Sequence, residues 1–340
     1  MKIGILNGGG DCAGLNAVTR GVVRESERLG YQVVGIRHGW AGLLGLDTTP
    51  LAWKDVSQII GQGGTILHTT RTNPFNRKDG PETVLANVKK LGLDALVAVG
   101  GEDTLSVAAK LSQMGLKVVG VPKTIDNDIV ATDVTFGFDS AVNVTVGAID
   151  RIQTTGESHD RIMVVEVMGR HAGWIAAHAG LASGANLILV PEQPIDLDQV
   201  AAFLKQRHSS GATASIVVVG EGCELKDHRL ADKSKLDEFG HARLGGIGET
   251  LAVELEKRVG IETRAVVLGH VIRGGSPSAF DRILATRLAV AAVKCIKDGE
   301  FGFMVCVHGN VISKVPLPEI LGKMKNLDSE MLSLIKEFSQ

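Results

Sequence analysis

Short runs of Val, Ile and Leu recur along the chain and alternate with longer stretches of amphipathic, helix-like sequence. The apolar runs cover residues 3–6, 33–36, 95–99, 118–121, 162–167, 216–219 and 265–268, and the helical stretches include 104–111 and 141–151. Continuous apolar runs of this length are typical of strands buried on both faces, as in parallel sheets covered by helices. The alternation therefore predicts an α/β protein with mainly parallel sheets and right-handed crossover connections.

Length and composition narrow the class of protein further. A chain of 340 residues, 44% of them hydrophobic, can bury a sizeable core and favours two lobes over one. Its 36 basic and 38 acidic residues nearly balance, so we expect no nucleic-acid partner and no membrane partner. A strand-like run starts too early to leave room for a signal peptide, which predicts a cytoplasmic location. Four cysteines without a CxxC spacing indicate neither disulfides nor a zinc site.

Glycines gather where the predicted strands end, which is where ligands bind in open parallel sheets. They lie at 8–10, 100–101, 169 and 274–275. The first of these turns leads into a helix predicted from Ala17, whose N–H groups suit a phosphate. A dinucleotide-binding oxidoreductase has a similar turn, but Arg37 and His38 follow the second strand where that class carries an acid. The sequence also lacks the GxxxxGK[ST] pattern of a P-loop enzyme.

The turns after two of the predicted strands carry carboxylates. Glu102, Asp103 and Thr104 follow the strand at 95–99, where helix capping is the alternative explanation. The strand at 118–121 ends in PKTIDND, which contributes Lys123, Thr124, Asp126 and Asp128. Phosphoryl transfer needs a carboxylate-bound metal, a cation near the transferred group and a base near the attacking hydroxyl. The two turns supply all three, which predicts a magnesium-dependent phosphotransferase centred on residues 122–128.

Two later strand ends add groups suited to recognition. Met168, Gly169 and Arg170 follow the strand at 162–167, and a segment containing His270 and Arg273 follows the strand at 265–268. We expect this His and Arg to bind one phosphate together, and three further arginines complete a set of donors suited to phosphate: Arg71, Arg161 and Arg264. The polar stretch 225–246 lacks apolar periodicity and is predicted to be an irregular surface insertion.

Several motifs occur in one order along nearly the whole chain: GGGDxxGxN, GGT…R, GGExT, PKTIDND, SHxRIxVVEVMGR, GEG and ETRAxVLGHxxRGGSP. In these motifs the chain resembles the 6-phosphofructokinase family, and most closely its pyrophosphate-dependent members. The resemblance implies two Rossmann-like lobes with the active site in the cleft between them. It places the donor-binding lobe at residues 1–137 plus about 277–325, and the sugar-phosphate lobe at 138–276 plus about 326–340. The implied reaction is Mg²⁺-dependent phosphoryl transfer to the 1-hydroxyl of fructose 6-phosphate.

The resemblance also implies a role for each candidate residue. Asp126 would be the base, Asp128 its support, and Thr124 a contact of the transferred phosphoryl group. Glu102 would help to hold Mg²⁺. The donor would be handled by Gly10, Arg71, Asp103, Lys123 and Arg170. The sugar would be held by Met168, Gly169 and Glu221, and its 6-phosphate by Arg161, Arg264, His270 and Arg273.

The oligomeric state and the acceptor are implied less completely. In the family, the residues matching Arg161 and Arg264 reach in from a neighbouring subunit, which implies at least a homodimer and leaves a homotetramer open. The sugar-binding residues do not separate fructose 6-phosphate from the longer sedoheptulose 7-phosphate.

The phosphoryl donor is predicted from one position. Family members that use ATP carry glycine after the acid of the GGDG or GGEG turn, whereas those that use pyrophosphate carry aspartate, as Asp103 here. Lys123 also replaces a glycine found in many ATP-dependent bacterial enzymes. We therefore predict pyrophosphate as the donor, with an ATP-dependent phosphofructokinase as the nearest alternative. A catalytically silent sugar-phosphate sensor is less favoured, because Asp126 and Arg170 are both present.

Some positions depart from the family pattern. Ala13 stands where proline is usual and His68 where glycine is common, and both lie near the predicted donor site. Arg20 and Arg24 resemble part of a basic effector site found in allosteric bacterial members. Residues that are not basic stand at other positions of that site, namely Trp53, Gln153 and Ser210. We expect little or no effector control.

Overall fold

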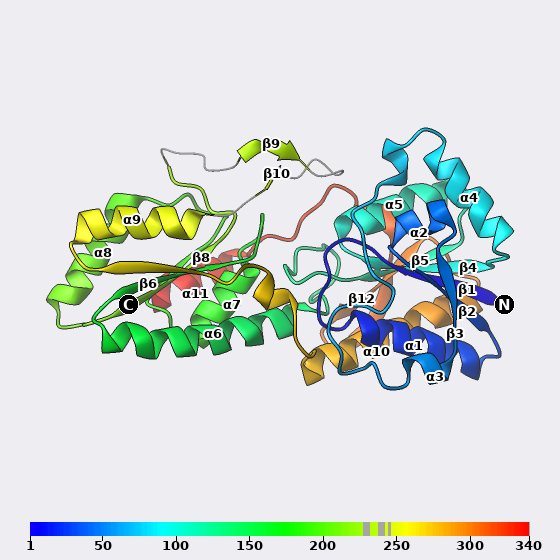
Figure 1. The fold of residues 1–340 in the computed structure, drawn as a ribbon, viewed down its shortest axis with the longest axis horizontal. Coiled ribbons are helices and arrows are strands. Elements are labelled where there is room, and N and C mark those ends of the chain that lie inside the picture. Colours follow the sequence, from blue (N-terminus) through cyan, green and yellow to red (C-terminus); the bar gives the residue numbers. More distant parts are fainter. Residues whose placement is uncertain (227–231, 237–241, 244–245, 340) are drawn as a thin grey trace.

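The computed structural model describes residues 1–226, 232–236, 242–243 and 246–339, which form two α/β units lying side by side, each around its own sheet (Figure 1). The larger sheet has the strand order β13-β12-β5-β4-β1-β2-β3. Its strands are β1 (Lys2–Asn7), β2 (Gln32–Ile36), β3 (Thr48–Leu51), β4 (Ala95–Gly100), β5 (Val118–Pro122), β12 (Phe303–His308) and β13 (Val311–Pro316). The inner pairs are parallel, and only β3 and β13 at the two edges pair antiparallel.

The smaller sheet is parallel throughout and has the order β11-β6-β8-β7. Its strands are β6 (Ile162–Val167), β7 (Leu187–Leu189), β8 (Ser215–Gly220) and β11 (Thr263–Val267). Every apolar run that the sequence marked as a strand is a strand here. The predicted α/β class with mainly parallel sheets is therefore confirmed.

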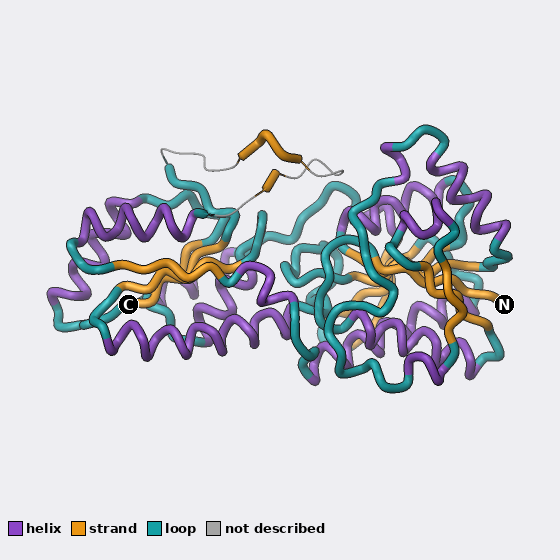
Figure 2. Tube along the Cα trace, in the orientation of Figure 1, coloured by secondary structure: helices purple, strands orange, loops and turns teal. Residues whose placement is uncertain are grey.

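Helices cover both faces of each sheet (Figure 2). The helices around the larger sheet are α1 (Leu15–Arg28), α2 (Trp40–Gly45), α3 (Trp53–Val56), α4 (Gly80–Lys90), α5 (Glu102–Gln113) and α10 (Ala279–Lys297), with the 3-10 turns η1 (Pro74–Asn76) and η3 (Leu317–Ile320). Those around the smaller sheet are α6 (Phe138–Ser158), α7 (Trp174–Ala182), α8 (Leu197–Ser209), α9 (Ile247–Val259) and α11 (Ser329–Phe338), with η2 (Gly269–Arg273). No helix in the described part of the chain is both long and apolar enough to cross a membrane.

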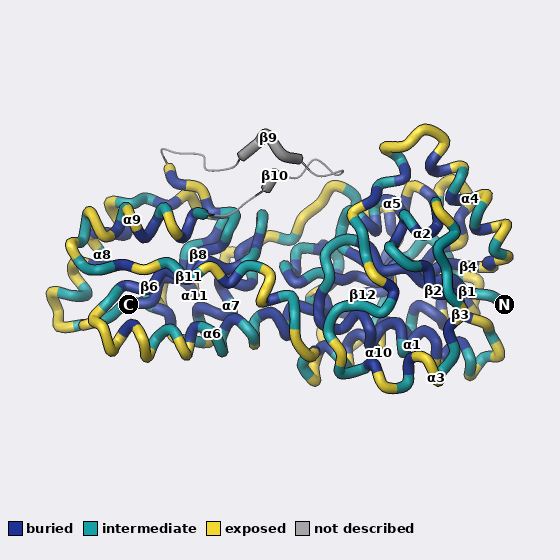
Figure 3. Tube along the Cα trace, in the orientation of Figure 1, coloured by how far each residue is buried: buried dark blue, intermediate teal, exposed yellow. Residues whose placement is uncertain are grey.

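The strands that carry the candidate site residues are the most deeply buried ones. Every residue of β4, β5, β6 and β8 is buried, which Figure 3 shows as dark blue at the centre of each unit. Parallel register aligns their carboxyl ends, pairing Gly100 with Pro122 in the larger sheet and Val167 with Gly220 in the smaller. The turns that follow these strands are thereby brought to one edge of each sheet.

The stretch 225–246 differs from its predicted irregular structure. It contains two short antiparallel strands, β9 (Asp232–Leu236) and β10 (Ala242–Arg243), so the prediction is wrong for that part. Its first residue, Leu225, is buried and bridges to Ile195. The remaining positions of the stretch, 227–231, 237–241 and 244–245, lie outside the described residues. The proposed boundaries of the two lobes stay a prediction.

Candidate active site

A pocket of about 310 Å³ collects the turns that follow strands of both sheets. Its walls come from the turns after β1, β4 and β5 in the larger sheet, from those after β6 and β8 in the smaller, and from three other segments. The lining residues are Gly9, Gly10, Arg71, Gly101, Glu102, Asp103, Thr104, Lys123, Thr124, Asp126, Asp128, Met168, Arg170, His171, Glu221, Arg273, Gly322, Lys323 and Met324. Most of the predicted site residues therefore meet in one place.

Four predicted residues do not line this pocket. Gly169 lies between two lining residues and accepts a hydrogen bond from Gly222 N (3.2 Å). His270 is exposed in η2. Arg161 immediately precedes β6, so the length of that strand, roughly 20 Å, separates it from the pocket. Arg161 and Arg264 both form ion pairs with Glu262 Oε1, at 2.8 and 2.5 Å. Within one chain, only Arg273 of the predicted 6-phosphate set reaches the pocket.

The glycine turn after β1 is held by the neighbouring loop. Gly8 N donates to Val99 O (2.9 Å), and Gly9 N donates to Thr70 O (3.0 Å). A Cβ on Gly8 would lie 2.4 Å from Thr104 Oγ1, which is closer than such atoms approach, so glycine is required there. Because the loop at residue 70 is bonded to this turn, the adjacent Arg71 is fixed at the pocket wall.

The turn after β4 places two carboxylates at the start of α5. The N-cap of this helix is Gly101, which supplies no side-chain bond, and Glu102 is already its first residue. Capping by Asp103 or Thr104, the alternative explanation for these residues, is therefore not observed. Acidic groups are favourable in the first turn of a helix because the helix dipole is positive there.

The PKTIDND turn follows β5 and is bonded to its surroundings at several points. Lys123 is 3% exposed, and its ammonium donates to Gly10 O. Burial lowers the pKa of Lys123. Asp126 N donates to Thr124 Oγ1 (3.1 Å), and Asn127 takes a left-handed backbone with φ 52°. The chain reverses at this asparagine, and the aspartates on either side both line the pocket.

Three carboxyl groups of the pocket have raised pKa values. Burial and the neighbouring Asp128 raise the pKa of Asp126 to about 7, while Arg273 opposes that rise. Burial also raises the pKa of Asp128 and of Glu221. Within the described structure, Asp126 Oδ1 is buried and has no hydrogen-bond partner. A carboxylate with this pKa and a spare acceptor atom is suited to take a proton from a bound hydroxyl.

The residues of the pocket fit Mg²⁺ in the way this ion usually binds. No group of three or more His, Cys, Asp or Glu among the described residues could hold a metal ion without help. Mg²⁺ commonly takes only one or two protein carboxylates and completes its shell with water and substrate phosphates. Glu102 supplies hard carboxylate oxygens at the pocket wall, beside the carboxylate of Asp103.

Several features of the site were not expected from the sequence. Gly322, Lys323 and Met324 line the pocket from the segment after η3, and His171 lines it beside Arg170. No apolar strand precedes residues 322–324, so no strand-end signal marked them.

The departures from the family pattern have local explanations. His68 has φ 56°, the left-handed region that favours glycine, and its ring stacks on His38 with centroids 4.9 Å apart. Trp53 packs against the two arginines that resemble part of the effector site of allosteric members, with its ring centre 4.7 Å from the Arg20 guanidinium and 5.0 Å from that of Arg24. The expectation of little effector control stays a prediction.

Comparison with known proteins assigns this arrangement to a family. The model of the family described as Phosphofructokinase matches residues 2–296. A Streptomyces coelicolor protein named pyrophosphate--fructose 6-phosphate 1-phosphotransferase is 52% identical, with 99% of each chain covered. An Amycolatopsis methanolica protein of the same name is 53% identical, with 97% of each covered. A second Streptomyces coelicolor protein, named ATP-dependent 6-phosphofructokinase 3, is 49% identical, with 96% of each covered.

Solved structures agree with this assignment. Phosphofructokinase from Saccharomyces cerevisiae has a TM-score of 0.81 and 32% identity; the match covers 99% of this chain but 47% of the yeast chain. A structure titled pyrophosphate-dependent phosphofructokinase, from Marinobacter aquaeolei, shares the fold with a TM-score of 0.84 at 23% identity, covering 97% of this chain and 86% of that one. The chain belongs to the phosphofructokinase family.

Proposed function

We propose that this protein transfers a phosphoryl group reversibly from pyrophosphate to the 1-hydroxyl of fructose 6-phosphate, giving fructose 1,6-bisphosphate and phosphate. The observation that carries the proposal is the presence of Asp103 and Lys123 in the same pocket as Asp126. Full-length relatives at 52%, 53% and 47% identity bear the name of this reaction, and two relatives named as ATP-dependent are 49% and 48% identical.

Asp126 acts as the general base of the transfer. Its carboxylate takes the proton of the sugar 1-hydroxyl while that oxygen forms a bond to the phosphorus of the donor. The bond from the same phosphorus to the bridging oxygen breaks, and inorganic phosphate leaves. In the reverse direction the protonated Asp126 returns the proton to the sugar oxygen. A pKa of about 7 suits both directions, because near neutral pH the group is populated in both protonation states.

Cationic groups offset the charge of the donor. Lys123 and Arg170 lie on the pocket wall together with Arg71, where their charges stabilise the phosphates during transfer. Thr124 contacts the phosphoryl group as it moves. Mg²⁺, held by Glu102 and by the donor phosphates, would supply further charge neutralisation.

The sugar phosphate is held by residues of the smaller sheet. Met168 and Glu221 follow β6 and β8, and Glu221 N donates to Val167 O (2.8 Å), which fixes the turn that carries it. Gly169 shapes the turn between Met168 and Arg170. Arg273 contributes to the 6-phosphate site from the same chain.

The rest of the 6-phosphate site comes from a second copy of the chain. His270 would join Arg273 in binding the 6-phosphate. We assign Arg161 and Arg264 to the site of a neighbouring subunit, because they lie at the other end of β6 and β11 from their own pocket. The active enzyme is then at least a dimer.

The charge of Asp103 disfavours a nucleotide donor. A carboxylate at this position occupies the region that a nucleotide α-phosphate would need and repels it. Two unit charges about 4 Å apart interact by roughly 4 kcal/mol at an effective dielectric near 20. Half of that, about 2 kcal/mol, still changes a donor preference by more than about tenfold.

Two substitutions at this position separate charge from volume. Asp103→Asn keeps the volume and removes the charge, whereas Asp103→Gly removes both. We expect kcat/KM for ATP relative to pyrophosphate to rise in Asp103→Asn and to rise further in Asp103→Gly. If neither variant changed the preference for pyrophosphate over ATP, residues other than Asp103 would determine the choice of donor. A wild-type protein that uses ATP at least as efficiently as pyrophosphate would refute the proposed donor.

A further inference from the structure

The segment that follows η3 crosses the PKTIDND turn and is bonded to both units of the protein. Lys325 N donates to Asp128 O (2.8 Å), at the end of that turn. Lys325 O accepts from Trp174 Nε1 (2.8 Å) at the start of α7 in the smaller unit. Leu327 N donates to Glu192 Oε1 (3.0 Å) in the same unit. The segment is therefore fixed against the turn that carries Asp126.

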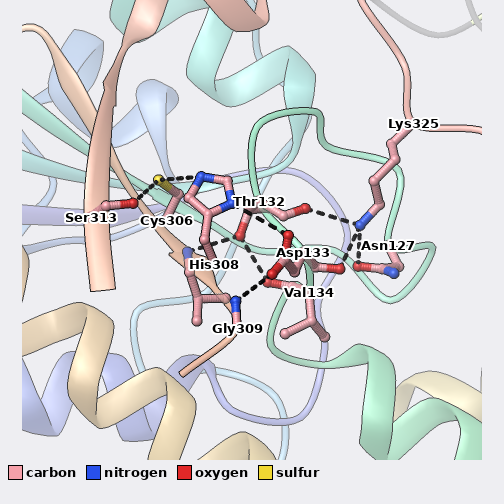
Figure 4. Close-up of polar contacts among 10 residues, drawn as sticks. Asn127, Thr132, Asp133, Val134, Cys306, His308, Gly309, Ser313 and Lys325 are labelled. Atoms are coloured by element: carbon pink, nitrogen blue, oxygen red, sulfur yellow. Dashed lines mark hydrogen bonds and ion pairs between the residues drawn. The ribbon is translucent and has the colours of Figure 1, made fainter. Parts of the chain in front are cut away.

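The ammonium of Lys325 makes hydrogen bonds to a single loop (Figure 4). It donates to Asn127 Oδ1 (3.1 Å), Thr132 O (3.0 Å) and Asp133 O (2.7 Å). A lysine ammonium has three N–H donors, and these contacts use them all. The indole ring of Trp174 covers the same ammonium, 5.2 Å from the ring centre. The cation is thus enclosed by the loop at 127–133 and by α7.

Asn127 is the part of this loop that matters for the site, because it lies between the two pocket carboxylates. Its side-chain oxygen accepts from Thr135 N (3.1 Å) as well as from Lys325 Nζ. Asparagine tolerates the left-handed backbone that Asn127 adopts when its side chain is hydrogen-bonded, so these contacts support the conformation of the turn. Among the residues that the structure describes, the Lys325 contact is one of two hydrogen bonds to this side-chain oxygen.

The opposite end of the loop is anchored on the β12–β13 hairpin. Thr132 Oγ1 accepts from Val307 N (3.2 Å), and Asp133 Oδ2 accepts from Gly309 N (2.5 Å). His308 Nδ1 lies 3.3 Å from Asp133 Oδ1. This end is fixed by the larger sheet, so Lys325 joins an anchored segment to the turn at Asn127.

Cys306 and His308 of this hairpin and Asp133 of the loop lie next to one another, but they do not act as a nucleophilic triad. Cys306 Sγ lies 3.8 Å from His308 Nε2 and 3.1 Å from Ser313 Oγ. The cysteine is fully buried, and burial raises the pKa of its thiol. A buried thiol with a raised pKa is unreactive, so these contacts serve to anchor Asp133.

We propose that Lys325 is a positioning residue that fixes Asn127, and through it Asp126 and Asp128, in the arrangement needed for transfer. The role rests on the proposed function, because that function makes Asp126 the base. Lys325 does not line the pocket, so we expect its loss to reduce kcat much more than it changes either KM.

The first test compares Lys325→Met with Lys336→Met, the same change on the exposed face of α11. Misplacing a catalytic group costs on the order of 10- to 100-fold in rate, so we expect kcat of Lys325→Met to fall by that factor. Hydrogen exchange of residues 124–135, followed by mass spectrometry, should become faster in Lys325→Met alone. Unchanged exchange, faster exchange throughout the chain, or an unchanged kcat would each overturn the proposal.

A second test uses pH and does not depend on removing the side chain. Burial lowers the pKa of Lys325 to about 8, opposed by Asp133 and Asp128 of the loop. His178 of α7 also faces this ammonium, and burial, with a smaller effect of Lys325, lowers the pKa of His178. The wild-type kcat should decline above pH 8 as the ammonium loses its proton. In Lys325→Arg the guanidinium stays charged, so this decline should move to higher pH. If kcat of Lys325→Arg declined over the same pH range as kcat of the wild type, the proposal would be overturned.

Failure of this proposal can be told apart from failure of the proposed function. A wild-type protein that transfers phosphate from neither pyrophosphate nor ATP would refute the function. The exchange measurement needs no activity and would then decide alone whether Lys325 holds the loop.

Discussion

With Asp126 as the proposed base, the rate of phosphoryl transfer should fall steeply below neutral pH, because this carboxyl must be ionised to accept the hydroxyl proton. Burial and Asp128 raise the pKa of this carboxyl to about 7 from an ordinary value of 3.8. With that pKa, about nine-tenths of the enzyme carries ionised Asp126 at pH 8 and about one-tenth at pH 6. The value of kcat/KM should therefore drop about tenfold between pH 8 and 6, and about tenfold again by pH 5.

Two substitutions should move this acidic limb in opposite directions. Asp128→Asn removes the nearby negative charge that raises the pKa of Asp126, so the limb should move to lower pH. Arg273→Met removes a positive charge that lowers the same pKa, so the limb should move to higher pH. The assay is the pH dependence of kcat/KM with pyrophosphate and fructose 6-phosphate. Circular dichroism at each pH confirms that the protein stays folded.

The same pKa has the opposite consequence for stability. Ionising a carboxyl whose pKa is raised by folding costs folding free energy, so the free energy of unfolding should decline as the pH rises from about 4 to 7. A pKa near 7 in place of 3.8 corresponds to about 4 kcal/mol, which is the upper limit of the gain in the free energy of unfolding expected from Asp126→Asn at pH 8.

A flat pH profile of kcat/KM between pH 8 and 5 would refute the reasoning about Asp126. An acidic limb that moves in the same direction in Asp128→Asn and Arg273→Met would also refute it.

Two further predictions test packing and assembly. A Cβ on Gly222 would lie 1.8 Å from the backbone oxygen of Arg170, so Gly222→Ala should lower the free energy of unfolding by about 1–3 kcal/mol and reduce kcat. The control is Gly61→Ala, whose added Cβ would have its nearest neighbour at 3.6 Å and should change neither quantity. Thermal unfolding and rate measurements test both variants. Co-refolding inactive Arg161→Ala with inactive Asp126→Asn should restore part of the activity if Arg161 serves a neighbour's pocket, and mixtures that stay inactive would contradict that assignment.

The central strands could be predicted from the sequence because strands buried on both faces consist mainly of apolar residues. Residues 118–121 are apolar throughout, and residues 162–167 are apolar except for the buried Glu166, since both faces of β5 and β6 are covered. The edge strand β13 has the sequence VISKVP and exposes several side chains, so no continuous apolar run marks it. The three residues of β7 are too few to form a pattern.

The site could be predicted as far as it is built from strand ends. Asp103 and Asp126 follow buried strands directly, and parallel register then brings their turns together. Met324 and Lys325 lie in the segment after η3, and no hydrophobic periodicity in that segment predicts that it passes beside the site. Arg161 immediately precedes β6, at the opposite end of that strand from the pocket, so its place in the sequence does not bring it to the strand ends that form the site.

The strand order of the larger sheet has a consequence for how the protein is made. In sequence order, β1 to β5 come first, all four strands of the smaller sheet follow, and β12, which pairs with β5, comes after them. On the ribosome the apolar edge of β5 has no partner until residues 303–308 have emerged. Unpaired apolar edges are prone to self-association, so the nascent chain is at its most vulnerable late in synthesis. A chaperone that shields β5 during this interval should increase the yield of folded enzyme.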